Sequence, residues 1–333
     1  MNYQINKITI IGDGGWGTTL AIHLLRKGYP VVVWGAFDAY IQELKKKRVN
    51  SKFLAGIKIP SGVQFTSQLD EAINFGELVV LAVPSQYLAQ TLKKIKLTDY
   101  KNKFFLSVIK GIDTKTHERM SQLIKSELGP IPLAVLSGPT IALEVAEHIP
   151  TTAVIASSNQ KLNAALQKIF NSSTFRIYTN TDLIGVEVGG SVKNVVAIAC
   201  GICDGLGLGT NTKAAIVTRG LAEIARLGKA MGAKSETFYG LTGLGDLVTT
   251  CFSPKSRNRS VGEELGRGKS IKNILSSMDM VAEGVVTAKA VYGLSKKLNV
   301  KMPITEEVYN ILYRNKKPAR ALSDLMTRSL KAE

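Results

Sequence analysis

The chain has 333 residues, with 43 Lys and Arg against 26 Asp and Glu, which gives a formal net charge of +17. Its residues are 45% hydrophobic and 21% charged, a composition that excludes an intrinsically disordered chain and supplies apolar surface for two domains. Three cysteines, an odd number, exclude a fully paired disulfide framework and favour a reducing compartment.

The sequence shows neither a secretory signal nor a membrane span. Residues 1–7 lack the apolar core of a signal peptide. No uninterrupted apolar run reaches the roughly 18 residues of a membrane-spanning helix, and the longest such run covers residues 195–203. We therefore expect a cytoplasmic protein without an integral membrane segment.

Short β-branched runs alternate with helical patterns in the first half of the chain. The predicted strands cover residues 7–11, 31–34, 78–83, 104–108, 133–136, 152–156 and 175–178. The predicted helices cover residues 15–27, 86–94, 118–128 and 160–170. Strands that are apolar throughout, without polar alternation, indicate a parallel sheet covered on both faces. We predict a doubly wound, Rossmann-like α/β domain over residues 1–182.

The second half loses the strand pattern, and helical segments follow one another. These segments cover residues 183–203, 212–231, 260–265, 287–298 and 305–313. We predict an all-α domain over residues 183–333.

A glycine-rich turn follows the first predicted strand and opens the first helix. Gly12, Gly14 and Gly17 fit the G-x-G-x-x-G pattern of dinucleotide-binding loops. In that pattern the first glycine permits the turn, the second lets the backbone approach a pyrophosphate, and the third allows the helix to pack on the strand. The strand, turn and helix context makes this loop a predicted dinucleotide site.

The cofactor type remains open at this stage. An NAD site usually has Asp or Glu at the end of the second strand, and an NADP site usually has Arg nearby. This strand ends in Trp34, Gly35 and Ala36, with Asp38 beyond it. The densest basic run, 45–48, has no interleaved aromatic residues and is typical of a solvated helix end rather than of a nucleic-acid site.

Polar residues that interrupt apolar surroundings define the candidate site. Lys110 follows a strand at the carboxyl edge of the sheet, where open α/β sheets bind ligands, and 137–140 follows the next strand. Lys193 precedes a wholly apolar helical run, although a lysine that extends its amine to solvent would also fit there. Residues 256–258, Ser-Arg-Asn, resemble an anion clamp, because Arg offers a bidentate fork to phosphate.

Eight segments in chain order resemble the NAD(P)-dependent glycerol-3-phosphate dehydrogenase family. They are residues 12–17, 109–111, 137–140, 190–194, 243–247, 256–259, 283–284 and 302–307. The resemblance implies oxidation of sn-glycerol 3-phosphate to dihydroxyacetone phosphate, with the reverse reduction supplying phospholipid synthesis. Two departures stand out: Asp13 replaces the alanine usual between the first two glycines, and Ala36 replaces the basic or His side chain that often meets the adenosine 2′-phosphate.

The resemblance also implies roles for individual residues. Lys193 would be the proton acceptor in the oxidation and the proton donor in the reduction. The substrate would be lined by Lys110, Gly138, Thr140, Lys193, Asp246, Ser256, Arg257 and Asn258. The cofactor, NADP or NAD, would be contacted by Gly12, Gly14, Gly15, Trp16, Gly17, Lys110, Ala142, Arg257, Val281 and Glu283. No metal is implied.

Lys193 would have to be a neutral amine in order to act as a base, because the C2 hydroxyl must lose its proton during hydride transfer. Burial and the charges of Lys110 and Arg257 would favour the neutral amine, whereas Asp246 would favour and orient the ammonium. Two other functions fit parts of the pattern: a related dehydrogenase of a hydroxy acid, which needs no phosphate clamp, and a basic nucleotide- or nucleic-acid-binding protein without catalysis. We expect a small phosphorylated substrate, no nucleic-acid partner and a homodimer.

Overall fold

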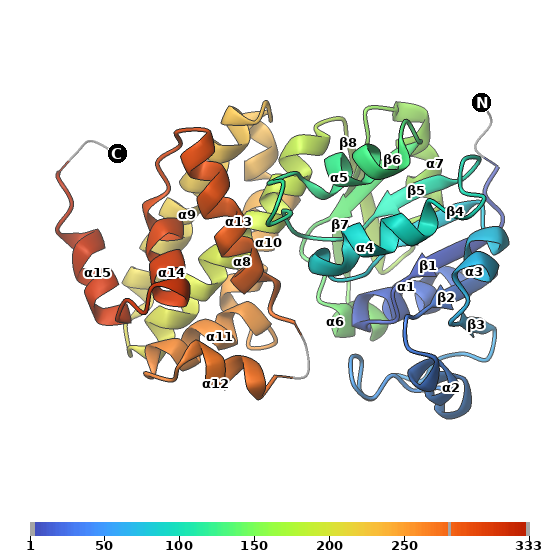
Figure 1. The fold of residues 1–333 in the computed structure, drawn as a ribbon, viewed down its shortest axis with the longest axis horizontal. Coiled ribbons are helices and arrows are strands. Elements are labelled where there is room, and N and C mark those ends of the chain that lie inside the picture. The colour runs from blue at the N-terminus through green and yellow to red at the C-terminus, as the bar shows by residue number, and fades with distance from the viewer. Residues whose placement is uncertain (1–3, 279–280, 331–333) are drawn as a thin grey trace. The chain divides into compact units, whose positions relative to one another are not determined.

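A computed structural model describes residues 4–278 and 281–330, and the chain divides into two compact units (Figure 1). The first unit consists of Met1–Asp113 with Glu118–Glu187, and the second of Thr114–His117 with Val188–Glu333. Each unit has its own hydrophobic core. The division falls within the long helix α8 (Leu183–Gly205), after its first turn.

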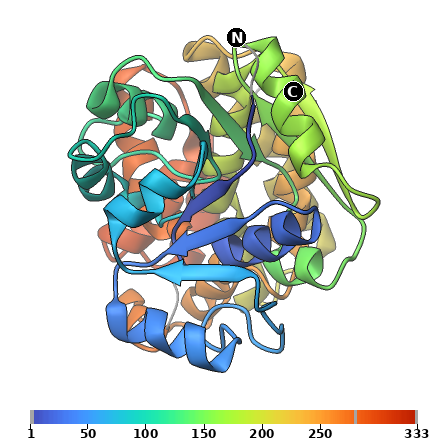
Figure 2. The same ribbon diagram turned by 90° about the vertical axis from the view of Figure 1, so that its right-hand side faces the viewer.

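The first unit is built on one eight-stranded sheet with the order β3-β2-β1-β4-β5-β6-β7-β8. Its strands are β1 (Ile8–Ile11), β2 (Val31–Trp34), β3 (Val63–Thr66), β4 (Leu78–Leu81), β5 (Phe104–Ser107), β6 (Leu133–Ser137), β7 (Thr151–Ala156) and β8 (Phe175–Asn180). All seven predicted strands are present, and β3 was not predicted. Figure 2 shows β1 to β4, coloured blue to cyan, lying side by side.

The expectation of a parallel sheet is correct for most of the sheet and wrong at one pairing. The strands β3 to β6 run parallel, whereas β7 pairs with β6 antiparallel, and β8 follows β7 in parallel. Antiparallel and parallel strands buried on both faces have the same apolar composition, so composition could not distinguish them.

Alternate residues of each central strand enter different cores. In β2, Val31 and Val33 pack in the core beneath α1 and α7, while Val32 packs with α3, α4 and α5 on the other face. This alternation requires helices on both faces and explains why the strands are apolar throughout. The helices of this unit are α1 (Gly15–Arg26), α2 (Asp38–Lys47), α3 (Leu69–Phe75), α4 (Ser85–Ile95), α5 (Met120–Leu128), α6 (Ala142–Ala146) and α7 (Gln160–Phe170).

The second unit is helical, as predicted. It contains most of α8 together with α9 (Thr210–Ala230), η1 (Ser235–Tyr239), η2 (Leu241–Gly245), α10 (Asp246–Phe252), α11 (Arg257–Gly266), α12 (Ile271–Ser276), α13 (Glu283–Lys297), α14 (Pro303–Tyr313) and α15 (Pro318–Met326). Side chains of α8, α11, α13 and α14 share one buried cluster.

Glycines allow α8 and α11 to cross with their backbones in contact. Gly201 and Gly205 on α8 face Gly262 and Gly266 on α11, each pair four residues apart and therefore on one face of its helix. A Cβ on Gly266 would lie 2.6 Å from the carbonyl oxygen of Ile202. This close crossing fixes the first turn of α11, which contains the predicted anion clamp, against α8.

Helix α8 is long and apolar enough to cross a membrane by length and composition, although Glu187 and Lys193 interrupt its apolar run. Of its most apolar window, 89% is buried within the fold. The helix therefore acts as the core helix of its unit.

Candidate active site

The glycine loop follows β1 and leads directly into α1, as predicted. Gly12 has a φ of 128°, and a Cβ on it would lie 2.7 Å from the backbone of Ala82, which follows β4. Because β1 and β4 are neighbours in the sheet, the loop turns against the end of the adjoining strand, and only glycine fits. A Cβ on Gly17 would overlap the carbonyl oxygen of Gly12, so Gly17 allows α1 to pack closely on the loop.

The N-terminus of α1 offers the features that a pyrophosphate requires. Gly14 is the N-cap residue and makes no side-chain capping bond, and a Cβ built on it meets nothing within 4 Å. The first N–H groups of the helix, from Gly15 onward, and the positive end of the helix dipole are thus available to an anion. The residues present fit a dinucleotide cofactor.

A buried asparagine that the sequence analysis did not identify holds this loop. Asn50 is fully buried, and its Nδ2 donates to the carbonyl oxygen of Asp13 at 2.8 Å and to Thr18 Oγ1 at 2.7 Å. Its Oδ1 accepts from the Tyr40 hydroxyl at 2.6 Å. The residue lies 37 positions from Asp13, and no local pattern marks it.

Two predicted cofactor residues lie in or against α1. Trp16, in its first turn, packs edge-on against Phe175 with ring centroids 6.3 Å apart. Ala142 begins α6, and its carbonyl oxygen accepts from Thr19 Oγ1 of α1 at 3.1 Å.

Lys110, Gly138 and Thr140 form one cluster beyond the carboxyl ends of β5 and β6. Lys110 Nζ donates to the Gly138 carbonyl oxygen at 2.9 Å and to Thr140 Oγ1 at 3.5 Å. Gly138 has a φ of 137°, a conformation that favours glycine. The three residues that the resemblance assigned to the substrate from this unit thus lie together.

Lys193 is buried in the helical unit and pairs with a buried carboxylate. Its Nζ forms an ion pair with Asp246 and donates to Thr250 Oγ1 at 2.7 Å, while Lys193 and Asp246 are only 5% and 1% exposed. The alternative of an amine reaching solvent is therefore wrong. Thr250 was not predicted, although it lies four residues after Asp246 on the same face of α10.

The predicted anion clamp lies at the start of α11. Ser256 caps this helix by accepting from Arg259 N at 3.3 Å, and Asn258 Oδ1 accepts from Gly284 N at 2.8 Å. A Cβ on Gly284 would lie 2.7 Å from the carbonyl oxygen of Asn194, so Asn258 lies beside the turn of α8 that contains Lys193. The Asn258 amide nitrogen is not needed for these bonds and can donate to an anion.

Three predicted cofactor residues of the helical unit also lie together. Arg257 Nη1 donates to the carbonyl oxygen of Val281 at 3.0 Å, and the negative charge of Glu283 acts on the Arg257 guanidinium. The side chain of Arg257 is exposed, which leaves its remaining N–H groups accessible to a ligand.

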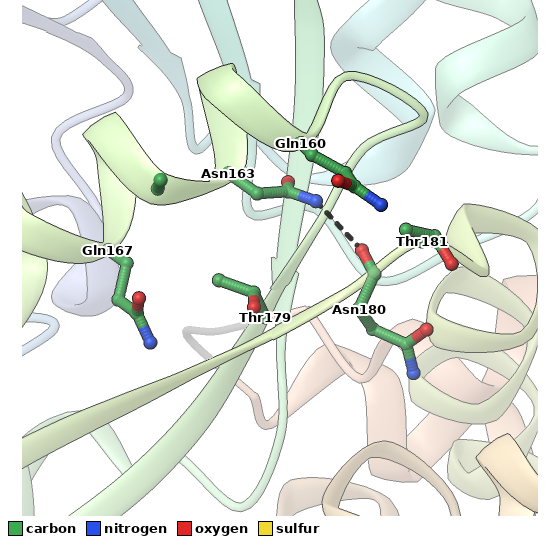
Figure 3. Close-up of a pocket in the computed structure, with 7 residues that line it drawn as sticks. Gln160, Asn163, Gln167, Thr179, Asn180 and Thr181 are labelled. Atoms are coloured by element: carbon green, nitrogen blue, oxygen red, sulfur yellow. Dashed lines mark hydrogen bonds between the residues drawn. The ribbon is translucent and has the colours of Figure 1, made fainter.

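A separate pocket of about 480 Å³ lies between α7 and the end of β8 (Figure 3). Its lining is uncharged and mostly polar, and it includes Asn163, whose Nδ2 donates to the Asn180 carbonyl oxygen at 2.9 Å. None of the predicted site residues lines this pocket. Within residues 4–278 and 281–330, no group of three or more His, Cys, Asp and Glu side chains is arranged to hold a metal ion.

Comparison with known proteins decides the family. Residues 7–163 match the NAD-dependent glycerol-3-phosphate dehydrogenase N-terminus, and residues 182–323 match the C-terminus of the same family. The chain belongs to this dehydrogenase family. Proteins named glycerol-3-phosphate dehydrogenase [NAD(P)+] from Chlorobium limicola and Geobacter sulfurreducens are 46% and 47% identical to it. Each alignment covers 98% of this chain, and 99% and 98% of the respective relative.

Solved structures of the family show the same fold. The crystal structure of glycerol-3-phosphate dehydrogenase from Coxiella burnetii matches with a TM-score of 0.94 at 37% identity, over 97% of this chain and 99% of that chain. The predicted α/β domain followed by an all-α domain is confirmed by these matches.

Proposed function

We propose that this protein is an NAD(P)-dependent glycerol-3-phosphate dehydrogenase that interconverts sn-glycerol 3-phosphate and dihydroxyacetone phosphate. Membership of the family over 98% of the chain supports the activity, since the relatives bear that name. The buried ion pair between Lys193 and Asp246, with Thr250 as a further partner, is the observation that carries the mechanism.

Lys193 is proposed as the proton-transfer residue. In the reduction its ammonium donates a proton to the carbonyl oxygen of dihydroxyacetone phosphate, and in the oxidation its amine accepts the proton of the C2 hydroxyl. The bound dinucleotide supplies or accepts the hydride at the same carbon. Asp246 and Thr250 orient the Lys193 amine, because a carboxylate and a hydroxyl oxygen accept two of its N–H bonds.

A phosphorylated substrate needs cationic and N–H donor groups, and the residues that we assign to it include such groups. We assign Arg257, Asn258 and Ser256 to the phosphate, because Arg binds phosphate through a fork of N–H donors. We assign Lys110, Gly138 and Thr140 to the substrate as well, with Lys110 also serving the cofactor. Binding energy from a phosphate remote from the reacting carbon holds that carbon in place for hydride transfer.

The remaining proposals concern the cofactor and the organisation of the chain. Gly12, Gly14, Gly15, Trp16, Gly17, Ala142, Val281 and Glu283 are assigned to the dinucleotide. We place the cofactor domain at residues 1–182 and the substrate domain at residues 183–333. We further propose that the protein is a cytoplasmic homodimer that provides glycerol 3-phosphate for phospholipid synthesis.

The test is a spectrophotometric assay at 340 nm with dihydroxyacetone phosphate and each reduced cofactor in turn. We expect oxidation of NADH or NADPH that depends on the phosphorylated ketone, and a loss of turnover of roughly 10²–10⁴-fold in Lys193→Ala with cofactor binding retained. Turnover of a 2-keto acid with no activity on dihydroxyacetone phosphate would contradict the proposal. Near-normal turnover in Lys193→Ala would contradict the role of Lys193.

A further inference from the structure

Asp13 introduces a carboxylate into the glycine loop, at the position between its first two glycines. The side chain turns toward the residue that follows β2: a Cβ built on Gly35 would lie 2.7 Å from Asp13 Cγ. The end of β2 is where dinucleotide-binding domains usually have the acidic residue that accepts hydrogen bonds from the adenosine ribose. In this chain the acidic group thus reaches that place from the loop and not from the strand.

One oxygen of the Asp13 carboxylate lacks the hydrogen-bond partner that a buried acidic group normally has. Its Oδ2 is buried and accepts no hydrogen bond from the part of the chain that the structure describes. Burial raises the pKa of Asp13 above its ordinary value, although its own backbone N–H and the charge of Lys52 act in the opposite direction. Although Oδ2 itself is buried, Asp13 as a residue is partly exposed, so a ligand on the glycine loop would lie beside its side chain.

Asp38, an acidic group that follows β2, is already engaged. Asp38, in the first turn of α2, accepts from Ser67 Oγ at 2.5 Å and from Gln42 Nε2 at 3.3 Å, and it lies on the surface. Ala36 has no hydrogen-bonding side chain. Asp13 is therefore better suited than Asp38 to meet a ribose.

Two basic groups of the run 45–48 are also engaged. Arg48 donates to the carbonyl oxygen of Val63 at 2.6 Å, and its guanidinium lies over the ring of Phe65. Lys47 pairs with Glu43 at 2.8 Å. These two members of the basic run 45–48 are thus occupied within their own segment.

We propose that the Asp13 carboxylate accepts a hydrogen bond from the adenosine ribose and thereby selects NAD(H) over NADP(H). The inference rests on the proposed function only in requiring that the glycine loop binds an adenine dinucleotide. A ribose with a free 2′-hydroxyl donates to the carboxylate, whereas a 2′-phosphate offers no donor and adds negative charge beside it. The Asp13 carboxylate would therefore strengthen the binding of NAD(H) and weaken the binding of NADP(H).

Isothermal titration of NADH and of NADPH into the whole protein tests this without relying on turnover. We expect the wild type to bind NADH at least about tenfold more tightly than NADPH, as a hydrogen bond to a charged group implies. Asp13→Ala should weaken NADH binding by about the same factor while NADPH binding is unchanged or improved. Asp13→Asn, which keeps the shape of the side chain and removes its charge, should also reduce the ratio of NADH affinity to NADPH affinity. Asp38→Asn is the matched control and should leave the ratio of the two affinities unchanged.

The outcomes separate this inference from the proposed function. If the wild type binds both dinucleotides equally or favours NADPH, or if Asp13→Ala leaves the ratio unchanged, the role of Asp13 is wrong while the dehydrogenase stands. If the wild type binds neither dinucleotide, the proposed function itself fails. Thermal unfolding of each variant shows whether the loop remains folded. A loss of NADPH binding alone in Lys52→Ala, together with NADPH preference in the wild type, would assign the selection to Lys52 instead.

Discussion

The ammonium of Lys193 forms a buried ion pair with the carboxylate of Asp246, a residue 53 positions away that begins α10. The pairing depends on the close approach of η2 to α8. A Cβ on Gly189 would lie 2.5 Å from the Thr242 carbonyl oxygen, so glycine at this position lets the start of α10 reach the turn of α8 that contains Lys193. The ion pair between Lys193 and Asp246 therefore contributes both to the proposed catalysis and to the stability of the helical unit.

Asp246→Asn should impair both properties. The buried Lys193 charge would lose its counter-charge, which costs about 3–5 kcal/mol for a buried pair. Turnover should fall roughly 100-fold, because the amine is no longer held in one orientation. Chemical denaturation and steady-state kinetics measure the two effects. Thr249→Val, on the neighbouring, partly exposed position of α10, is the control, and an equal loss of activity in it would contradict the specific role of Asp246.

Gly14→Ala should separate folding from cofactor binding. A methyl group at this position meets no protein atom within 4 Å, so we expect the melting temperature to stay close to that of the wild type. The same methyl group would lie where a pyrophosphate approaches the loop, and dinucleotide affinity should fall by about tenfold or more. Gly12→Ala, by contrast, should destabilise the protein, because its Cβ would overlap the Ala82 backbone. Unchanged affinity in Gly14→Ala would argue against this binding site.

Glu223 of α9 should make stability depend on pH. It is 1% exposed and accepts from the backbone N–H of Ile304 at 2.6 Å and of Thr305 at 3.1 Å, at the start of α14. Burial raises the pKa of Glu223 above its ordinary value of 4.5. Since the folded state then holds the proton more tightly than the unfolded state, this contribution is present at low pH and is lost as pH rises through the raised pKa.

The check is the free energy of unfolding of wild type and Glu223→Gln between pH 4 and pH 8. The glutamine does not titrate. The free energy of unfolding of the wild type relative to that of the variant should therefore decrease as pH rises through the raised pKa of Glu223. Glu236→Gln, an exposed control in η1, should follow the wild type. A difference that does not vary with pH would contradict the shifted pKa.

The three cysteines should be unreactive in the folded protein. Cys200, Cys203 and Cys251 are all buried, and burial raises the pKa of Cys203 to about 11. The contact with Cys251, with burial as a further cause, also raises the pKa of Cys200. Because the thiolate is the reactive form, Ellman's reagent at pH 8 should label few thiols in the native state and all three after denaturation. Rapid labelling of the native protein would contradict the observed burial.

Much of the fold follows from local patterns. Helix α7 has the predicted bounds, because its helical period of apolar residues persists over the whole element, and β2 has the predicted residues, because it is a continuous apolar run. The strand β3 was missed, since Val63–Thr66 is short and contains an exposed Gln64. The short helix α10 was missed as well, because a glycine-rich segment precedes it and hides its period.

Some features of the candidate site can likewise be predicted from the sequence, whereas others depend on the tertiary structure. The chain sequence contains the glycine loop, Lys110, Lys193 and the Ser-Arg-Asn segment, because each has a chemical character that conflicts with its apolar or structured surroundings. Only the tertiary structure decides their partners: Asn50 beneath the loop, Thr250 beside Lys193, and Gly138 as the acceptor for Lys110. Such contacts join residues tens of positions apart and leave no periodic signal. The direction of the Asp13 carboxylate is of the same kind, since the strand β2 that defines its surroundings comes later in the chain.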